Sequence, residues 1–206
     1  MDFSRTHLSL RRPLTSYSKV QQLVSALIRN RPQRWEAKPL LNLGCGPFPH
    51  PAFVNVDWHW RPGVVCWDAT KPLPFADRSM EGIFSEHCIE HLPFVAVSGV
   101  LRELRRVLLP GGTLRIIVPD GELYARNYTA GLPMPLGDGE MTAMFSINRI
   151  FREHGHQFIY DFETLALVLR HAGFEAEKRS FMEGRDERLL IDRAERAVES
   201  LYVDAH

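Results

Sequence analysis

The stretch LLNLGCGP, residues 40–47, decides the fold of this chain. An apolar run stops at Gly44 and Gly46, and a second short apolar run, residues 53–56, ends at Asp57. A strand that stops at paired glycines exposes backbone N–H groups, so a ligand can approach the sheet edge closely. The acid that closes the next strand supplies a carboxylate for the two ribose hydroxyls of a nucleoside. The stretch therefore predicts a nucleotide-type pocket.

The composition is typical of a globular protein. The chain has 206 residues, of which 45% are hydrophobic and 24% charged, and this excludes collagen-like and disordered classes. We expect residues 1–206 to form a single domain. The formal net charge is zero, but residues 1–38 carry eight Lys and Arg side chains against two acids. This N-terminal arm is either a solvated segment or a contact for an anionic partner.

The cysteines and the hydropathy pattern indicate in which cellular compartment the protein is expected. Cys45, Cys66 and Cys88 form no CxxC pair, which is typical of reduced thiols in a cytosolic protein. No apolar run approaches the length of a membrane span. The sequence therefore predicts a cytoplasmic protein without an integral membrane segment.

Apolar periodicity predicts strands that alternate with helices. Helices are expected at residues 20–28 and 97–108 and between Asp161 and Gly173, and strands at 40–43, 53–56, 64–67, 80–84, 113–118, 174–181 and 200–203. The second helix should stop at the Pro-Gly-Gly sequence 110–112. Alternation of this kind predicts an α/β fold with a mostly parallel, seven-stranded sheet and helices on both faces.

Two connections depart from that regular pattern. Only ten residues separate Gly46 from Asp57, and three of them are prolines, so an ordinary crossover helix does not fit there. Residues 121–157 are rich in glycine and proline, with a short helix expected near 141–151. We interpret 121–157 as a lid or substrate insertion, because long loops in compact domains are usually functional.

Several segments together resemble a known family. The segments LLNLGCGP, VNVD, WDATKPLPF, GIFSEHCIEHL, LRELRRVLLPGGTLRIIVPD and HAGF resemble the class I S-adenosylmethionine-dependent methyltransferases, in particular the small bacterial type-11-like group. The resemblance covers roughly residues 40–120, with weaker support to Phe174. It implies a Rossmann-like fold with a shortened helix after the glycine loop, and S-adenosylmethionine as the cofactor.

The resemblance also implies a cofactor site. Its members are Asn42, Gly44, Cys45, Gly46, Pro47, Asp57, Trp58, Asp68, Ala69, Ser85, Glu86 and His87. Asp57 would hold the ribose, Trp58 would pack on the adenine face, and Asp68 would accept from the adenine amino group. The alternative for Asp68 is a turn acid before Thr70.

Four side chains are the catalytic candidates: Glu86, His87, His91 and His156. In-line displacement at a sulfonium methyl mainly requires alignment of the reactants and exclusion of water. A hydroxyl acceptor benefits in addition from a base such as histidine. The competing interpretation is that these histidines orient loops through hydrogen bonds. No metal ligand is assigned.

Two other functions remain open. The sequence His87-x-x-Glu90-His91 fits the inverted zinc-protease pattern, which would make the chain a zinc metallohydrolase. Pro93 follows closely, however, and opposes the long helix that such a metal site requires. The other alternative is a noncatalytic domain that only binds the cofactor.

The acceptor is the least determined part of the function. Basic and aromatic residues do not interleave along a strand pair, so no nucleic acid is expected as a partner. We expect a small-molecule acceptor, and the resemblance favours a saccharide or glycoconjugate precursor. A homodimer is left open.

Overall fold

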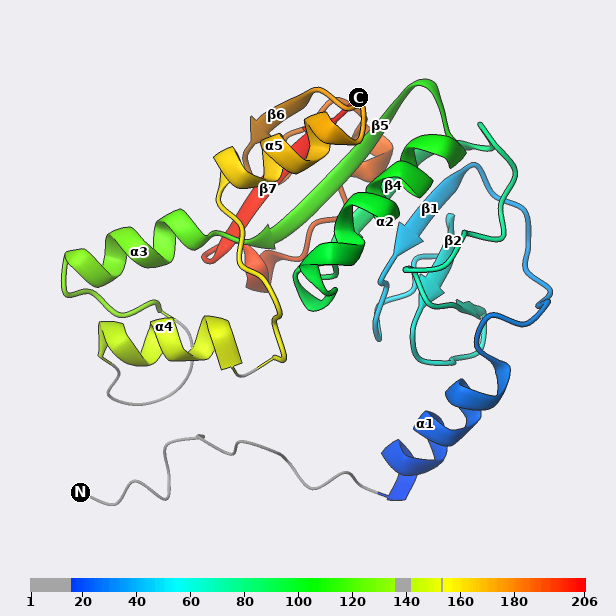
Figure 1. Ribbon diagram of the computed structural model, residues 1–206, viewed down its shortest axis with the longest axis horizontal. Helices are drawn as coiled ribbons and strands as arrows, with labels where there is room; N and C mark the ends of the chain where they lie inside the picture. Colours follow the sequence, from blue (N-terminus) through cyan, green and yellow to red (C-terminus); the bar gives the residue numbers. More distant parts are fainter. Residues whose placement is uncertain (1–15, 136–141, 153) are drawn as a thin grey trace.

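The computed structural model describes residues 16–135, 142–152 and 154–206. These residues form a seven-stranded sheet in the order β3-β2-β1-β4-β5-β7-β6 (Figure 1). The strands are β1 (Leu40–Leu43), β2 (Phe53–Asp57), β3 (Val64–Cys66), β4 (Met80–Glu86), β5 (Leu108–Pro119), β6 (Ala176–Arg179) and β7 (Ser200–Ala205). β7 is antiparallel to both of its neighbours, β5 and β6, and the other strand pairs of this sheet are parallel. The expected mostly parallel α/β sheet is confirmed.

Helices and short turns flank the sheet. The helices are α1 (Ser16–Ile28), α2 (Phe94–Val107), α3 (Gly121–Thr129), α4 (Ala143–Arg152) and α5 (Phe162–His171), and the 3₁₀ turns are η2 (Ile89–His91), η3 (Glu187–Leu189) and η4 (Ala194–Arg196). α2 and α5 lie side by side on one face, where they bury the larger core (Figure 1). On the other face, Leu189 of η3 packs with Phe53, Phe84 and Ile117.

The connection between β1 and β2, residues 44–52, contains no helix, as its short length and three prolines predicted. Two buried asparagines tie it to the sheet instead. The Asn55 Oδ1 atom accepts from the His50 N–H (2.8 Å) and from the Asn42 side chain (3.1 Å). The Lys38 ammonium also donates to the Pro51 carbonyl (2.5 Å). The shortened helix expected after the glycine loop is therefore replaced by a braced loop.

One prediction about the middle of the chain is wrong. The Pro-Gly-Gly sequence does not separate α2 from β5, because α2 ends at Val107 and β5 already begins at Leu108. The register shifts between the pairs Met80↔Leu108 and Gly82↔Thr113, so residues 109–112 bulge within the strand. A Cβ at Gly112 would lie 2.6 Å from the Glu81 carbonyl oxygen, so this close approach requires glycine.

The start of the 121–157 segment, to which the sequence analysis assigns no element, is helical. It forms α3, whose N-cap is Asp120: its side chain accepts from the Leu123 N–H (3.2 Å). The expected short helix is confirmed as α4, and the two helices enclose a small core of Tyr124, Met134 and Ile150. Residues 136–141 and 153 of this segment, and residues 1–15 of the N-terminal arm, lie outside the described residues.

The apolar stripe of α1 does not face the sheet. Val20, Leu23 and Leu27 are 60%, 63% and 55% exposed. The buried side is marked by Ser25, whose hydroxyl accepts from the Trp60 N–H (2.8 Å) and donates to the Gln21 carbonyl (2.6 Å). The helix predicted at this position is correct, but polar contacts rather than the apolar stripe attach it to the domain.

A buried arginine joins the antiparallel strand β7 to the body of the sheet. Arg115 on β5 is fully buried and pairs with Asp192 (2.6 Å) and with Asp204 on β7 (2.8 Å). It also donates to the Glu183 carbonyl (2.9 Å). Its removal would leave the buried Asp192 without a cation, while Asp204 would keep only Arg179, at 3.5 Å. An uncompensated buried carboxylate is one of the costliest changes a core can undergo.

Among the described residues, no helix combines the length and apolarity needed to cross a membrane. The assignment of the whole chain to a single domain stays a prediction.

Candidate functional site

The glycine loop lies at the carboxyl ends of β1 and β2, where this type of sheet binds ligands. The Gly44 and Cys45 N–H groups donate to the Val56 carbonyl (2.8 and 3.1 Å). The Gly46 N–H donates to the Asp57 carboxylate (2.9 Å). Gly44 and Gly46 have φ angles of 74° and 53°, a region that favours glycine. The loop is thus held against the end of β2 by its own backbone.

The two glycines differ in what surrounds them. A Cβ at Gly44 would lie 2.3 Å from the Cys88 Sγ and 2.5 Å from the Cys88 Cβ, whereas a Cβ at Gly46 would meet nothing within 4 Å. Gly44 is therefore required by the contact with Cys88, a residue of the segment that follows β4. Of the two glycines, Gly46 is the one whose surface is open to a ligand.

Asp57 is both a structural anchor and a ligand candidate. Its Oδ1 accepts from the His59 N–H (2.7 Å) and from Arg61 (3.3 Å), while its Oδ2 accepts from Gly46. Burial acts to raise the pKa of this carboxyl, but hydrogen bonds from His59 and Gly46 outweigh it and lower the pKa. A carboxylate offers about four acceptor positions. Oδ2 therefore retains room for one hydroxyl rather than for the expected pair.

On the adenine side of the predicted site, Asp68 also combines a structural contact with a free acceptor oxygen. The Asp68 Oδ1 accepts from the Thr70 N–H (2.9 Å) and hydroxyl (2.7 Å), so the turn interpretation of this acid is correct, and Oδ2 is left for a ligand. Ala69 follows it in the same turn. Arg29 of α1 stacks on the Trp58 ring, 3.5 Å from its centroid. One face of the Trp58 ring is therefore covered by Arg29, and only the other face could pack on an adenine.

Four other predicted cofactor residues are placed less favourably. The Asn42 side chain is buried and bonded to Asn55, which makes it a structural residue of the sheet. Cys45 is buried, and burial raises the pKa of its thiol to about 12, so it remains a neutral thiol. Pro47 is exposed beyond the loop. Ser85 near the end of β4 is buried, with its hydroxyl on the inside of the molecule.

Glu86 is held in an ion pair at the end of β4. Its carboxylate pairs with the Arg193 side chain and accepts from the Arg193 N–H (3.1 Å). This pair fixes the segment after β6 against the end of β4. Glu86 therefore has a structural task, and its catalytic and cofactor-binding roles stay predictions.

His87 is likewise held in place. It adopts a left-handed backbone conformation (φ 49°), and its Nε2 lies 2.9 Å from the Ser200 hydroxyl of β7. Burial, with help from nearby Arg196 and Arg193, lowers the pKa of the ring to about 2. The geometry thus supports the competing interpretation, a histidine that orients a loop, over a general base.

The remaining two catalytic candidates meet around a buried acid. Glu90 of η2 is completely buried, and the described residues give neither of its oxygens a hydrogen bond. The Glu90 Oε1 lies 3.8 Å from the His91 Nε2 and 4.0 Å from the His156 Nε2, and 3.4 Å from the His87 Nδ1. Burial raises the pKa of Glu90 to about 8 and lowers that of His156 to about 4. The buried Tyr160 hydroxyl also lacks a described partner.

This arrangement is not that of an inverted zinc protease. The motif starts at a left-handed residue and continues as a three-residue 3₁₀ turn, so His87 and His91 do not share one face of an α-helix. The residue that joins His91 and Glu90 is His156, from the segment after α4, and local sequence spacing gives no sign of this. In the sequence analysis, Glu90 belongs only to the inverted zinc-protease pattern and is not a site candidate otherwise.

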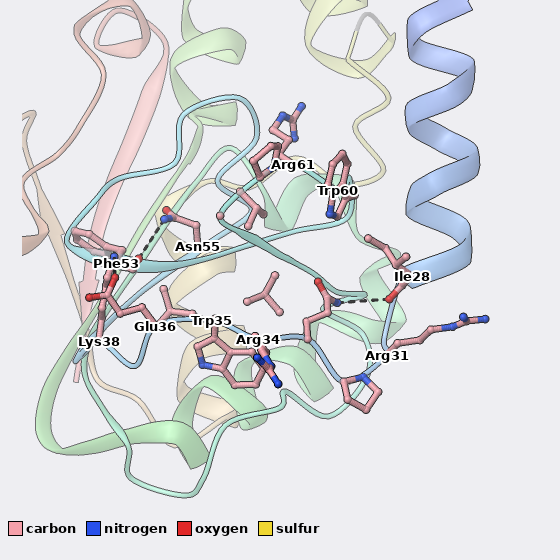
Figure 2. A pocket seen from close by; sticks show the side chains of 17 residues that line it. Ile28, Arg31, Arg34, Trp35, Glu36, Lys38, Phe53, Asn55, Trp60 and Arg61 are labelled. Atoms are coloured by element: carbon pink, nitrogen blue, oxygen red, sulfur yellow. Dashed lines mark hydrogen bonds and ion pairs between the residues drawn. The ribbon is translucent and has the colours of Figure 1, made fainter.

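A separate hollow lies at the free edge of the sheet. It has a volume of about 610 Å³ and opens between β2, β3 and residues 31–38, with Trp35, Asn55 and Arg61 in its wall (Figure 2). The Gln33 side chain pairs with the edge of β3 beside it, accepting from the Cys66 N–H (2.9 Å) and donating to the Cys66 carbonyl (2.8 Å). None of the predicted cofactor residues lines this hollow.

Comparison with protein families supports the interpretation of the carboxyl-end site. A family model described as Methyltransferase domain matches residues 50–116. The match begins after the glycine loop and runs into β5, so it contains Asp57, Asp68 and the segment that follows β4. Comparison with curated proteins gave no significant match.

Solved structures show the fold. A SAM-dependent methyltransferase from Archaeoglobus fulgidus is similar at 17% identity and a TM-score of 0.54, over 90% of this chain and 93% of that chain. A possible histamine N-methyltransferase from Thermotoga maritima shares 18% identity over 90% and 87% of the two chains, with a TM-score of 0.49. A Mesorhizobium loti methyltransferase shares 15% over 89% and 95%, also at 0.49. The Archaeoglobus likeness confirms the expected Rossmann-like, class I methyltransferase fold.

Proposed function

Because the chain has the class I methyltransferase fold and matches the methyltransferase domain family, we propose that it transfers a methyl group from S-adenosylmethionine to a small acceptor. In this reaction the acceptor's lone pair forms a bond to the methyl carbon, the carbon–sulfur bond breaks, and its electron pair returns to sulfur. The acceptor then loses a proton. The products are the methylated acceptor and S-adenosylhomocysteine.

The observation that carries the proposal is the junction of the glycine loop with Asp57. The open Gly46 surface and the free position on Asp57 Oδ2 lie at adjoining carboxyl ends, and Gly46 donates to that same carboxylate. Asp68 follows β3, which pairs with β2, so its free oxygen lies further along the same sheet edge. One ribose hydroxyl at Asp57 and the adenine amino group at Asp68 match this order of acceptors.

For the acceptor, we propose a small molecule, with a saccharide or glycoconjugate precursor preferred. What the protein must supply is alignment, since displacement at a sulfonium methyl demands little acid–base chemistry. The contacts of Glu86 and His87 hold the end of β4 rigidly against β7 and the segment after β6. A rigid end of β4 suits such an alignment task.

Calorimetry with S-adenosylhomocysteine tests the cofactor assignment. Loss of the carboxylate in Asp57→Asn should weaken binding by at least about tenfold, because a hydrogen bond to a charged group contributes about 1.5–3 kcal/mol. Asp68→Asn should weaken it less. Asp77→Asn is the matched control, since that acid is 74% exposed and bonded to Arg106, away from the loop. Wild-type protein that binds neither S-adenosylmethionine nor S-adenosylhomocysteine would end the proposal.

The acceptor itself can be found with labelled cofactor. Incubation of the protein with a metabolite extract and methyl-labelled S-adenosylmethionine should label a small, protease-resistant product. Label that appears in protein or RNA would refute the small-acceptor part while leaving methyl transfer intact. Cofactor binding without labelling of any fraction would instead support the noncatalytic alternative.

A further inference from the structure

The Glu90 side chain is a buried carboxyl group without a described hydrogen-bond partner. Three imidazole nitrogens surround its Oε1 at 3.4–4.0 Å, yet none of them makes a hydrogen bond to it, and no other described residue does. A completely buried carboxylate without a partner is strongly unfavourable. Distances slightly longer than a hydrogen bond, from several nitrogens to one oxygen, leave space for an ion among them.

The His156 ring has the orientation of a metal ligand. Its Nδ1 lies 2.5 Å from the Ile150 carbonyl, and a carbonyl can only accept, so Nδ1 carries the proton. Nε2 of the neutral ring therefore presents its lone pair, and this is the atom that faces Glu90. Metal-binding histidines characteristically donate their other ring N–H to a backbone carbonyl in this way.

The same segment of chain fixes the other groups. The Gln157 and Phe158 N–H groups both donate to the Glu90 carbonyl (2.7 and 3.2 Å), and the Gln157 side chain donates to the His91 carbonyl (2.8 Å). The His91 and His156 rings pack edge to face with their centroids 4.8 Å apart. The three side chains are therefore held together before any ligand arrives.

We infer that Glu90, His91 and His156 bind one divalent transition-metal ion. Their donor atoms all lie within 4.8 Å of one another. Zinc bonds of about 2.0–2.2 Å place tetrahedral ligands about 3.3 Å apart, so the observed 3.8 and 4.0 Å must contract by about 0.5–0.7 Å. The widest pair of donor atoms, up to 4.8 Å apart, must close by up to about 1.5 Å when the ion binds. Two imidazoles and one carboxylate suit zinc or iron(II) and leave at least one coordination position free.

This site differs in its ligands and its task from the rejected protease pattern. His87 is bonded to Ser200 rather than to a metal, and Glu90 is a ligand instead of a base. The ion connects η2 with the segment that follows α4, two parts of the chain that are distant in sequence. It thereby fixes α4 against the end of β4. The inference concerns this chain's own donor groups and does not depend on methyl transfer.

Zinc binding to untagged, full-length protein tests the site. After treatment with a chelator and dialysis, Zn²⁺ alone should bind at one ion per chain in calorimetry and elemental analysis. His91→Ala and His156→Ala should each lower the affinity at least tenfold, and Glu90→Gln should do the same. His171→Ala, at an exposed position on α5, is the control that should bind like the wild type.

Stability measurements separate metal binding from folding. Without metal, Glu90→Gln should be at least as stable as the wild type, because it replaces an unpartnered carboxyl by a neutral group of the same shape. With excess Zn²⁺ the order should reverse, since only the wild type gains binding energy. Zn²⁺ should also slow hydrogen exchange at the Gln157 and Phe158 amides.

Two results would overturn the inference. The first is a wild-type chain that takes up no stoichiometric Zn²⁺, Mn²⁺, Co²⁺ or Fe²⁺. The second is a His91→Ala, His156→Ala double variant that binds Zn²⁺ as tightly as the wild type. If the alanine variants do not fold, Glu90→Gln alone decides, because binding equal to that of the wild type would remove the carboxylate from the site.

Discussion

The contact between Gly44 and Cys88 gives the sharpest prediction about the glycine loop. Gly44→Ala and Gly46→Ala both place an L-residue at a positive φ, which costs about 1–2 kcal/mol each. Only at Gly44 does the new Cβ overlap another residue, at 2.3 and 2.5 Å from the Cys88 side chain. Such overpacking adds about 1–3 kcal/mol. We therefore expect a loss of about 2–5 kcal/mol for Gly44→Ala against about 1–2 kcal/mol for Gly46→Ala.

The free energy of unfolding from urea titration measures the difference, and thermal melting checks it. For a chain of this length about 1 kcal/mol shifts Tm by about 2–4 °C, so the two variants should separate by roughly 2–12 °C. Adding Cys88→Gly to Gly44→Ala completes a double-mutant cycle and should show a favourable coupling of about 1–3 kcal/mol. Equal stability of the two alanine variants, or a coupling below about 0.5 kcal/mol, would refute the steric reasoning.

Three further predictions concern the scaffold. Arg115→Met should destabilise the fold by about 3–5 kcal/mol in urea, because the buried Asp192 loses its cation and Asp204 keeps only Arg179, and a loss under about 1 kcal/mol would contradict this. Gln33→Ala should speed hydrogen exchange at the Cys66 amide without altering the central strands; unchanged exchange would mean that Gln33 does not protect the edge. Hydrogen bonds from Arg106 lower the pKa of Glu103, so its stabilising effect is present above the unfolded pKa, near pH 4.3, and is lost as the pH falls. The Tm difference between wild type and Glu103→Gln should therefore narrow on acidification, and a difference that is constant from pH 7 to pH 3 would oppose this.

The elements with strong local signals were predicted well. Apolar residues at helical spacing in α2, including Val97, Val100 and Leu104, are buried against the sheet. Asp161 caps α5 as expected, accepting from the Thr164 N–H (2.8 Å), and Gly173 follows in a left-handed conformation. These features depend on neighbours within one or two turns, so the sequence suffices to find them.

The errors occur where tertiary contacts override the local pattern. The Pro-Gly-Gly sequence predicts a helix stop followed by a turn. In the structure, however, β5 pairs with β4 on both sides of this sequence, which forms a bulge within the strand. The apolar stripe of α1 predicts burial, but Ser25 and Arg29 make the contacts that position the helix. Glu86 ends a strand as catalytic acids do, and only its distant partner Arg193 shows its structural task.

The sequence by itself determined the position of the glycine loop and the absence of a helix behind it. Ten residues with three prolines cannot form a crossover helix, and this limit holds whatever the rest of the chain does. Only the tertiary structure decided that Cys88 fills the space beside Gly44 and that His156 joins His91 at Glu90. Both contacts bring together segments that are far apart in sequence, and no local propensity encodes such a distance.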